Sequence, residues 1–481
     1  MITDVELINA QIKANRPLSD LQFLEREIRD WLNSPERKMM IEGKEYYKYK
    51  QPINDKVRKA IGKDSTLVPL MNVVNHKWLD NQYAKLVDQK TNYLLALKPS
   101  MDGEDKKYID HMQRIFNNKF LNKLRRVGTN TFQCGVGWLY VLPLNGELQF
   151  IRFEPEEVKP YWADSDHTIL DAILRIYNAE EYQGAEKKIV QKVEFYDSEG
   201  ITYYDLKDGR LTLVGKVTHL RTSTGKLLNW EKLPVIPFRY NADEISLLTR
   251  VKSLQDGMNE ILSKFGDDMS EDIRNTIIVL VNYDGEDLAE FRTNLMQYGA
   301  VKVRSEGQGS NGDVKTLQVE VNAENYKAIL QVLKEKIIEN GRGLDSKNDK
   351  MSGAPNQMNI KSMYSDLDLD ANAMEAEFQS SLEELQWFIK KYLSWTGKGD
   401  FSNSSVEITF NRDILMSEAE AITMCKDSEG IISKETIITN HPWVNDVEKE
   451  LIRVNKEREE QTNPYGSSFP TTGNKVIENE S

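Results

Sequence analysis

The strongest constraint on the fold is a helical segment at residues 243–271, which is longer than the helices of ordinary domains. Apolar residues recur along it at intervals of three and four, no proline interrupts it, and Asn241 or Asp243 can cap its start. At 1.5 Å per residue this helix would be roughly 43 Å long. Such a rod suits an elongated subunit that packs beside copies of itself, and a helical enzyme domain with long helices is the alternative.

Two further rods follow the first one. The second spans 323–340, with Gly341 as its expected C-cap, and the third spans about 360–396. Residues 342–359 between them are polar and carry Gly, Pro and Asn, so they are expected to form a long loop. Between the first two rods the pattern predicts a small β-α-β-β insert, with strands at 277–281, 301–304 and 314–321 and a helix at 287–298.

The rest of the chain mixes helices with antiparallel strands. Amphipathic helices are expected at 18–32 and 76–97, and short β runs fill 135–240. Asn145-Gly146 separates two of these runs, and this dipeptide favours a tight hairpin. The sequence therefore predicts an α+β fold that is mainly helical.

The elements expected in the last part of the chain are short. A strand is expected at 406–410 and three short helices at 417–460. Residues 461–481 are rich in Asn, Ser, Thr, Gly and Pro and are expected to be a disordered tail. At roughly 100–200 residues per domain, the 481 residues correspond to about three domains.

Composition excludes several classes of protein. The 63 Lys and Arg residues are outnumbered by 76 Asp and Glu, so the net charge of −13 has the wrong sign for tight binding of nucleic acid through its phosphates. The longest aliphatic run, at 277–281, is far too short to span a membrane. The two cysteines, Cys134 and Cys425, lack metal-ligand spacing and are expected to be reduced.

No motif for catalysis or metal binding stands out. A G-x-G-x-x-G pattern at 307–312 joins two β runs instead of opening a helix, and no Walker A sequence is present. The five histidines are scattered, so we expect no catalytic residue, metal site or cofactor. A metal-dependent nuclease or processing factor remains the competing class and would require a convergent acidic pocket. A membrane-surface or cytoskeletal scaffold would require a basic amphipathic helix, which is missing.

Three stretches resemble a known family, the portal proteins of tailed bacteriophages, in the branch typical of siphophages of Gram-positive hosts. Residues 86–95 contain the family's Asp-Gln-Lys-x-x-Tyr-Leu-Leu core. Residues 237–241, followed by 251–256, resemble the entry into its first stem helix, and residues 352–368 resemble its tunnel loop and the next helix. Residues 430–444 resemble its crown segment. Within the tunnel-loop stretch, residues 354–359 are more polar than the family's version. The resemblance covers roughly residues 40–460.

The resemblance implies a division of the chain into named parts. These are the wing (1–240), the first stem helix (241–272), the clip (273–321), the second stem helix (322–341), the tunnel loop (342–359), the long helix behind it (360–399), the crown (400–460) and the tail (461–481).

The resemblance also implies a function and partners. Such proteins form a ring of twelve subunits at one capsid vertex, and double-stranded DNA passes through its channel without sequence recognition. The implied partners are the large terminase subunit, which docks at the clip, the major capsid and scaffolding proteins, and a head-completion or adaptor protein. The implied location is the virion, with assembly in the host cytoplasm, no enzymatic activity and no membrane. A non-enzymatic ring adaptor of the head-tail junction is the alternative.

Site residues are expected in two places. The segment 359–389 carries seven acidic residues and one lysine, and an acidic channel wall would repel DNA phosphates. Lys347 and Lys350 would form a sparse positive ring on the loop, or are simply solvated lysines. The full set of expected channel residues is Lys347, Asp349, Lys350, Asn356, Gln357, Asp366 and Asp370. The residues expected to dock terminase at the clip, whose strand 314–321 is expected to pair across subunits, are Asp284, Glu286, Arg292, Arg304 and Asn311.

Overall fold

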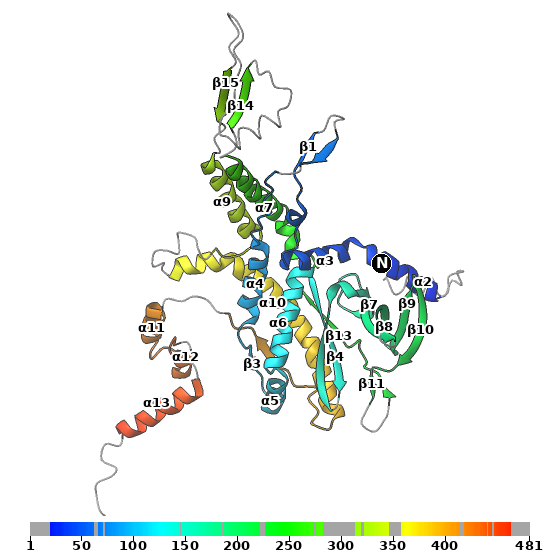
Figure 1. Ribbon diagram of the computed structural model, residues 1–481. Helices are drawn as coiled ribbons and strands as arrows, with labels where there is room; N and C mark the ends of the chain where they lie inside the picture. The colour runs from blue at the N-terminus through cyan, green and yellow to red at the C-terminus, as the bar shows by residue number, and fades with distance from the viewer. Residues whose placement is uncertain are drawn as a thin grey trace, which may run out of the picture. The chain divides into compact units, whose positions relative to one another are not determined.

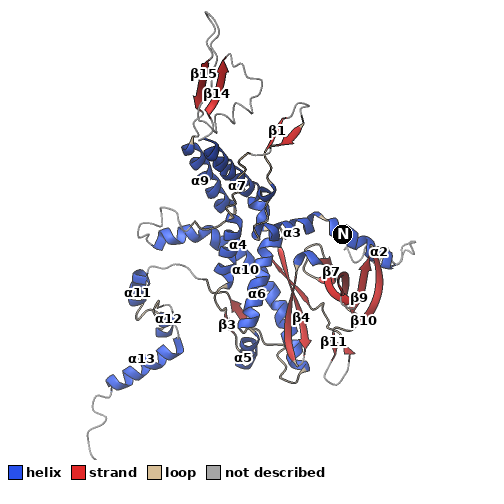
Figure 2. Ribbon diagram, viewed as in Figure 1, coloured by secondary structure: helices blue, strands red, loops and turns tan. Residues whose placement is uncertain are grey.

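The computed structural model describes most of the chain and has an α+β fold (Figures 1 and 2), which confirms the predicted fold class. It divides into two compact units, Met1–Asp345 with Asp366–Asp413, and Ser346–Ser365 with Ile414–Ser481. The described residues are 20–61, 66–70, 73–144, 146–183, 186–221, 227–272, 276–281, 313–318, 322–345, 357–412, 418–439, 441–444 and 447–462.

A three-stranded antiparallel sheet lies at the centre of the first unit. Strand β4 (Val136–Leu144) is its middle strand, between β13 (Val235–Arg239) and β5 (Glu147–Phe153). Successive side chains of a strand point to opposite faces, and both faces of β4 are buried. Trp138 therefore belongs to one hydrophobic core and Leu139 to another.

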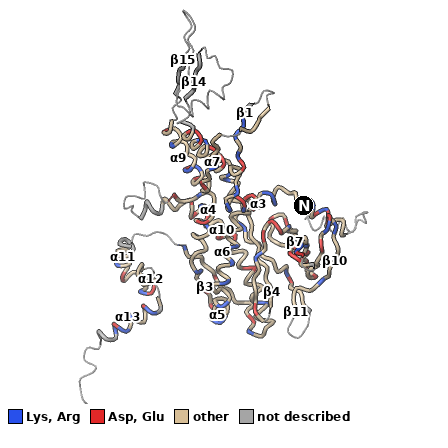
Figure 3. Tube along the Cα trace, in the orientation of Figure 1, with Lys and Arg blue, Asp and Glu red and all other residues tan. Residues whose placement is uncertain are grey.

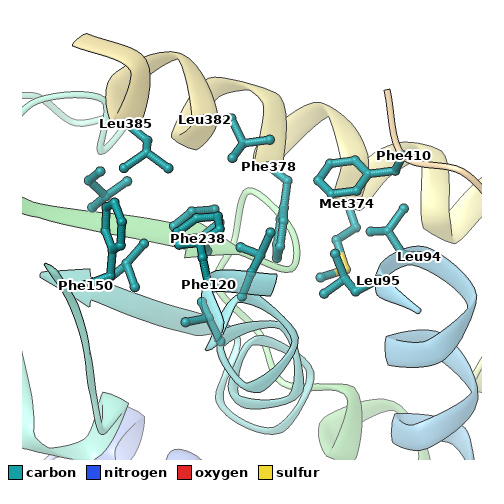
Figure 4. Packing of buried hydrophobic residues seen from close by; sticks show 14 of the residues in the cluster. Leu94, Leu95, Phe120, Phe150, Phe238, Met374, Phe378, Leu382, Leu385 and Phe410 are labelled. Carbon is teal, nitrogen blue, oxygen red and sulfur yellow. The ribbon is translucent and has the colours of Figure 1, made fainter. Parts of the chain in front are cut away.

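The first core lies between this sheet and a group of helices. The long helix α10 (Gln357–Trp395) contributes Met374, Phe378, Leu382 and Leu385, which recur at helical spacing and are all buried. Figure 4 shows Phe378, Leu382 and Leu385 pointing from α10 toward the phenylalanines of the sheet and α6, which are Phe238, Phe150 and Phe120. Met374 lies beside Leu94 and Leu95 of α4. The other helices of this core are α4 (Gln82–Leu95), α5 (Lys106–Ile115), α6 (Asn118–Cys134), α7 (Leu247–Asp272) and α9 (Ala323–Asn340).

The second core lies between the other face of β4 and a five-stranded antiparallel sheet. Its strands follow one another in sequence order, and the turn between β9 and β10 has Asp208 and Gly209 at positive φ. In the three-stranded sheet, β4 and β5 pair on either side of Asn145-Gly146 as the sequence predicts, with Gly146 at positive φ. The elements of this part are α2 (Asp20–Asn33), α3 (Pro35–Tyr47), β6 (Val158–Trp162), β7 (Leu170–Gln183), β8 (Glu186–Asp197), β9 (Gly200–Lys207) and β10 (Arg210–Val217).

Gly43 allows α3 to approach α6 closely. A Cβ atom added at Gly43 would lie 1.9 Å from the backbone oxygen of Gln133, whereas one at Gly257, in α7, would meet nothing within 4 Å. We expect Gly43→Ala to destabilise the chain by about 1–3 kcal/mol or more, because the two helix backbones must separate. Gly257→Ala should stabilise it by about 0.5–1 kcal/mol through helix propensity. Urea unfolding of both variants measures the difference, and equal effects would contradict the tight contact.

Helices α7 and α9 form a pair that confirms the first two predicted rods. The ring of Phe265 lies 5.1 Å from that of Tyr326, and the Tyr326 hydroxyl donates to Asp268 at 2.6 Å. At the end of α9, Gly341 is the C-cap, as expected, but the left-handed residue is Arg342, with φ of 49°. The two-stranded sheet of β14 (Thr276–Val281) and β15 (Asp313–Gln318) lies beyond the C-terminal end of α7 and the N-terminal end of α9 (Figure 1). It confirms two strands of the insert.

Several predicted boundaries differ from the structure. Helix α4 begins at Gln82 and not at residue 76, because residues 74–81 are extended along α7. Helix α10 begins at Gln357, so 357–359 belong to the helix and not to the loop. The insert's predicted helix at 287–298 and strand at 301–304 lie outside the described residues.

The remaining elements are short. An extended segment carries a hairpin of β1 (Lys59–Ile61) and β2 (Leu67–Pro69), and β16 (Glu407–Thr409) pairs with β3 (Ser100–Asp102). Two further short strands and two 3-10 turns are β11 (Leu220–Arg221), β12 (Leu227–Leu228), η1 (Pro52–Asp55) and η2 (Pro155–Glu157). In the second unit, the three predicted helices are present as α11 (Glu418–Asp427), α12 (Lys434–Thr439) and α13 (Val447–Thr462).

Candidate functional site

A buried carboxylate joins four separate parts of the chain. Asp370, in α10, accepts from Lys90 Nζ at 2.7 Å and from the hydroxyl of Tyr240 at 2.7 Å through Oδ2. Its Oδ1 accepts from Arg250 at 3.0 Å and lies 3.5 Å from Nη1 of Arg342. Lys90 belongs to α4, Tyr240 precedes α7, Arg250 is in α7, and Arg342 follows α9. We call these five residues the Asp370 network.

The network places one negative charge among three positive ones. Asp370 and Lys90 are each only 3% exposed, so both charges are removed from water. Burial alone would raise the pKa of Asp370, but Lys90, Tyr240 and Arg250 outweigh it and hold that pKa below its usual range. Burial also raises the pKa of the Tyr240 hydroxyl, which therefore stays protonated and donates to the carboxylate. The network depends on Asp370 remaining ionised.

The end of α9 is fixed to the network through its backbone. The amide of Gly343 donates to the carbonyl of Ile338 at 2.9 Å and that of Arg342 to Glu339 at 3.0 Å, which is the Schellman pattern. Glycine usually occupies the left-handed position of this motif, and here Arg342 does. Lys90 Nζ donates to the Arg342 carbonyl at 3.0 Å. The left-handed turn thus presents both the carbonyl and the guanidinium of Arg342 to the network.

Consecutive polar residues of α4 bind different elements. Gln89 donates to the carbonyl of Leu344 at 2.9 Å and accepts from its amide at 2.8 Å. Asp88 accepts from the hydroxyl of Tyr47 in α3 at 2.7 Å, and Tyr93 donates to Asp368 in α10 at 2.5 Å. The Asp-Gln-Lys-x-x-Tyr core of this helix is therefore an anchor for two helices, α3 and α10, and for the turn after α9.

A row of buried polar residues runs along one side of α7. Gln255, Asn259, Ser263 and Asp267 are spaced by four, so they lie on one face of the helix, and all four are buried. We call this row the polar ladder. Its side chains bind the non-helical backbone of residues 76–81 and the first turn of α4, and 76–81 have no sheet partner among the described residues.

Each rung of the ladder binds that backbone directly. Asp267 accepts from the amide of His76 at 2.6 Å, and Ser263 accepts from Trp78 at 2.9 Å. Asn259 accepts from the amide of Asp80 at 3.0 Å, and Gln255 donates to the Asp80 carbonyl at 2.6 Å and accepts from the amide of Tyr83 at 3.1 Å. The ladder satisfies backbone groups that burial would otherwise leave unpaired.

The ladder ends in a charged contact. Asp267 pairs with Lys56 at 3.0 Å and with the His76 ring at 3.0 Å. Burial would raise the pKa of Asp267, but the His76 amide and Lys56 lower it overall. Next to it, the Trp78 ring packs on Gly266, where a Cβ atom would lie 2.7 Å from the ring. The segment before α4 is therefore held along α7 from Gln255 to Asp267.

Comparison with known proteins identifies the family. The family described as phage portal protein, SPP1 Gp6-like, matches residues 33–464. The chain belongs to this family. The portal protein of Bacillus phage SPP1 is 28% identical over 412 residues, which are 84% of this chain and 79% of that protein. The portal protein of Clostridium phage phiCD119 is 27% identical over 425 residues, which are 86% of this chain and 91% of that protein.

A solved structure also matches, at lower similarity. It is a chain of the neck of a native GTA particle computed with C12 symmetry, with a TM-score of 0.34 and 12% sequence identity. The match covers 74% of this chain and 88% of that chain.

The stretches that suggested the portal family meet in the Asp370 network. Residues 86–95 supply Lys90, residues 237–241 supply Tyr240, and Arg250 lies next to the stretch 251–256. Residues 352–368 end two positions before Asp370, and their Asp368 binds Tyr93. These segments are far apart in the sequence, so the family features describe one junction between helices.

The structure places only some of the expected channel residues. Lys347, Asp349, Lys350 and Asn356 lie outside the described residues, and Gln357 is the first residue of α10. Asp366 is exposed on α10. The prediction that Asp370 lines a channel is wrong, because its carboxylate is buried and paired within the subunit.

The expected clip residues, Asp284, Glu286, Arg292, Arg304 and Asn311, all lie outside the described residues. Among the residues that the structure describes, no group of three or more His, Cys, Asp or Glu side chains is arranged to hold a metal ion. Within the same part of the chain, no helix combines the length and the hydropathy needed to cross a membrane.

Sequence reasoning missed the polar ladder. The apolar period of 243–271 was the stronger pattern, and the polar residues beside it look like an ordinary solvent-facing stripe. The usable signal was composition, because three of the four rungs, Gln255, Asn259 and Ser263, are uncharged and each repeats four residues after the last. A solvent-facing stripe of a long helix usually carries more charge.

Proposed function

We propose that the chain is the portal subunit of a tailed phage and closes into a ring through which DNA is packaged and ejected. The observation that supports this most is the Asp370 network, which fixes α7 and the end of α9 to α10 and α4 at one buried point. A ring that carries DNA must transmit force between its parts, and a buried, fully paired junction provides such a connection.

The structure supports an assignment of the chain's parts. The pair α7 and α9 corresponds to the stem, and 273–321, between the two helices, corresponds to the clip. Residues 342–359 would be the tunnel loop, although residues 343–345 are fixed on Gln89 and 357–359 are helical. The helices and sheets of residues 1–240 would be the wing, and 400–460 the crown. Strand β16 belongs to the first compact unit, so the crown would begin after it.

The channel surface is proposed on chemical grounds. Asp366 and Glu383, both exposed on α10, have the sign that repels DNA phosphates, and Lys347 and Lys350 would be the sparse positive contacts on the loop. With a net charge of −13, the chain would let DNA pass without binding it tightly. This charge suits a conduit better than a binding protein.

The proposed partners are those of a portal vertex. The large terminase subunit would dock at the clip during packaging, and a head-completion or adaptor protein would replace it afterwards. The major capsid and scaffolding proteins would surround the ring during assembly in the host cytoplasm. We propose that the chain has no enzymatic activity of its own and that terminase supplies the energy.

Native mass tests the proposal directly. Twelve copies of the 55.5 kDa chain give 666 kDa, and light scattering of the purified protein should report a mass near this value. Particles viewed end-on in negative stain should show an axial hole. A small globular oligomer with metal-dependent nuclease activity would instead refute the portal assignment.

A further inference from the structure

A hairpin arm projects from the side of α7, and several apolar side chains among its described residues are exposed. The arm consists of residues 52–78 and carries the two-stranded hairpin of β1 and β2. Leu67 is 66% exposed, and Val57, Val68 and Leu70 are exposed as well. A two-stranded hairpin is only marginally stable alone in water, and exposed aliphatic side chains add to its cost. The arm is therefore expected to have a binding surface to cover it.

The polar ladder fixes the height of the arm along α7. Asp267 binds both segments at the base of the arm, through Lys56 before the hairpin and through His76 after it. The neighbouring residue, Asp268, binds Tyr326 in the second turn of α9. The base of the arm and the first turns of α9 are thus at the same level of the helix pair.

Helix α9 carries a second apolar patch at this level. Val332 is 52% exposed, and Ile329, one turn before it, is exposed as well. Both residues follow Tyr326 by one to two turns, and within the part of the chain that the structure describes both remain exposed. The exposed part of α9 is otherwise polar, with Gln331, Glu335 and Lys336 beside the patch. An apolar pair on this surface is expected to meet a partner.

The two patches lie on opposite sides of α7. At 100° per residue, Phe265 and Asp268, which contact α9, are on the far side of the helix from Ser263 in the polar ladder. Figure 1 likewise shows the β1 hairpin on one side of α7 and α9 on the other. A closed cyclic ring joins one side of each subunit to the opposite side of the next, with all copies at the same height. The arm and α9 lie on opposite sides of α7, so this symmetry would bring the arm of one copy toward α9 of the next.

We propose that the hairpin of each arm packs on Ile329 and Val332 of α9 in the next copy of the chain. This inference rests on the proposed ring. The charges are complementary, because residues 52–78 carry five Lys and Arg against two Asp and Glu, whereas α7 and α9 together carry six against nine (Figure 3 shows these charges along the trace). The arm would pack on the outer side of the neighbouring stem, and the side of α7 and α9 that faces the channel would stay free.

Site-directed cross-linking tests the contact. In a Cys425→Ser background, Val68→Cys combined with Val332→Cys should give a ladder of covalent oligomers when assembled rings are treated with a bifunctional maleimide. The buried Cys134 stays in place. Each single variant should give no ladder. Val68→Cys combined with Ile189→Cys, an exposed position on β8, is the matched control and should give none either.

The outcomes separate this inference from the proposed function. Rings of the expected mass that yield no ladder would overturn the arm contact and leave the portal function intact. A ladder from Met269→Cys with Val332→Cys alone would assign the patch to a direct contact between helices and would also overturn it. Failure of the unmodified chain to form a ring would refute both. On the unmodified chain, amide exchange of residues 67–70 should slow at least tenfold between monomer and ring, and unchanged exchange would contradict the contact.

Discussion

Replacement of Asp370 by Asn should destabilise the chain by about 3–5 kcal/mol, because it leaves the buried Lys90 and the partly buried Arg250 without their counter-charge. Asn keeps the shape of the side chain, so the loss reports charge and not packing. Urea unfolding at neutral pH measures it. Asp366→Asn is the matched control, since Asp366 is one turn earlier on α10 and exposed, and should change stability by no more than about 0.5 kcal/mol.

The pH dependence gives the prediction a second readout. The folded-state pKa of Asp370 is below its unfolded value, so its contribution is complete above the unfolded pKa of about 3.9 and is lost as the pH falls through the folded pKa. The difference between the original chain and Asp370→Asn should therefore be largest at neutral pH and shrink below about pH 4. A difference that is the same at every pH would mean that the charge of Asp370 is not what stabilises the junction.

Replacement of Asn259 by Leu should loosen the arm from α7. The change leaves the amide of Asp80 without its acceptor and the side chain of Gln51, which Asn259 contacts at 2.6 Å, without its donor. Each buried group left unpaired costs about 1–3 kcal/mol, so we expect a loss of about 2–5 kcal/mol. Leu is a better helix former than Asn, so helix propensity does not account for a loss.

Hydrogen exchange localises this effect. Amides of residues 76–83 should exchange faster in Asn259→Leu, while those of the central sheet should not change. Glu260→Leu places the same side chain on the exposed face one residue away. It should change the free energy of unfolding by no more than about 0.5 kcal/mol and leave the exchange rates of these amides unchanged. Equal exchange in the two variants would show that the ladder does not hold the extended segment.

The apolar periods of the sequence predicted the long helices well, because a face that must be buried leaves a regular spacing. The second rod was predicted at 323–340, and the structure has α9 at Ala323–Asn340. The start of α4 was wrong because residues 76–81 have a helical pattern but gain more from bonding to α7 as extended chain. That gain comes from a segment about 180 residues away, and no local pattern encodes it.

The role of Asp370 was beyond the sequence for a related reason. Its neighbours Asp366 and Asp368 are acidic, so the row looked like one solvent-facing stripe of a helix. Only the arrival of Lys90, Tyr240 and Arg250 from three other segments makes one of these carboxylates a buried ion partner. The family resemblance identified the segments that contain or adjoin these residues, but it did not show that the segments contact one another.

The central strand β4 limits where this subunit can flex. Its side chains alternate between the two hydrophobic cores, so Trp138 and Leu139 tie the five-stranded sheet and the helical half into a single block. Sliding one half over the other would pull alternate side chains of β4 out of close packing. Shape changes during DNA passage are therefore expected in segments outside this block, while the block itself moves as a rigid body.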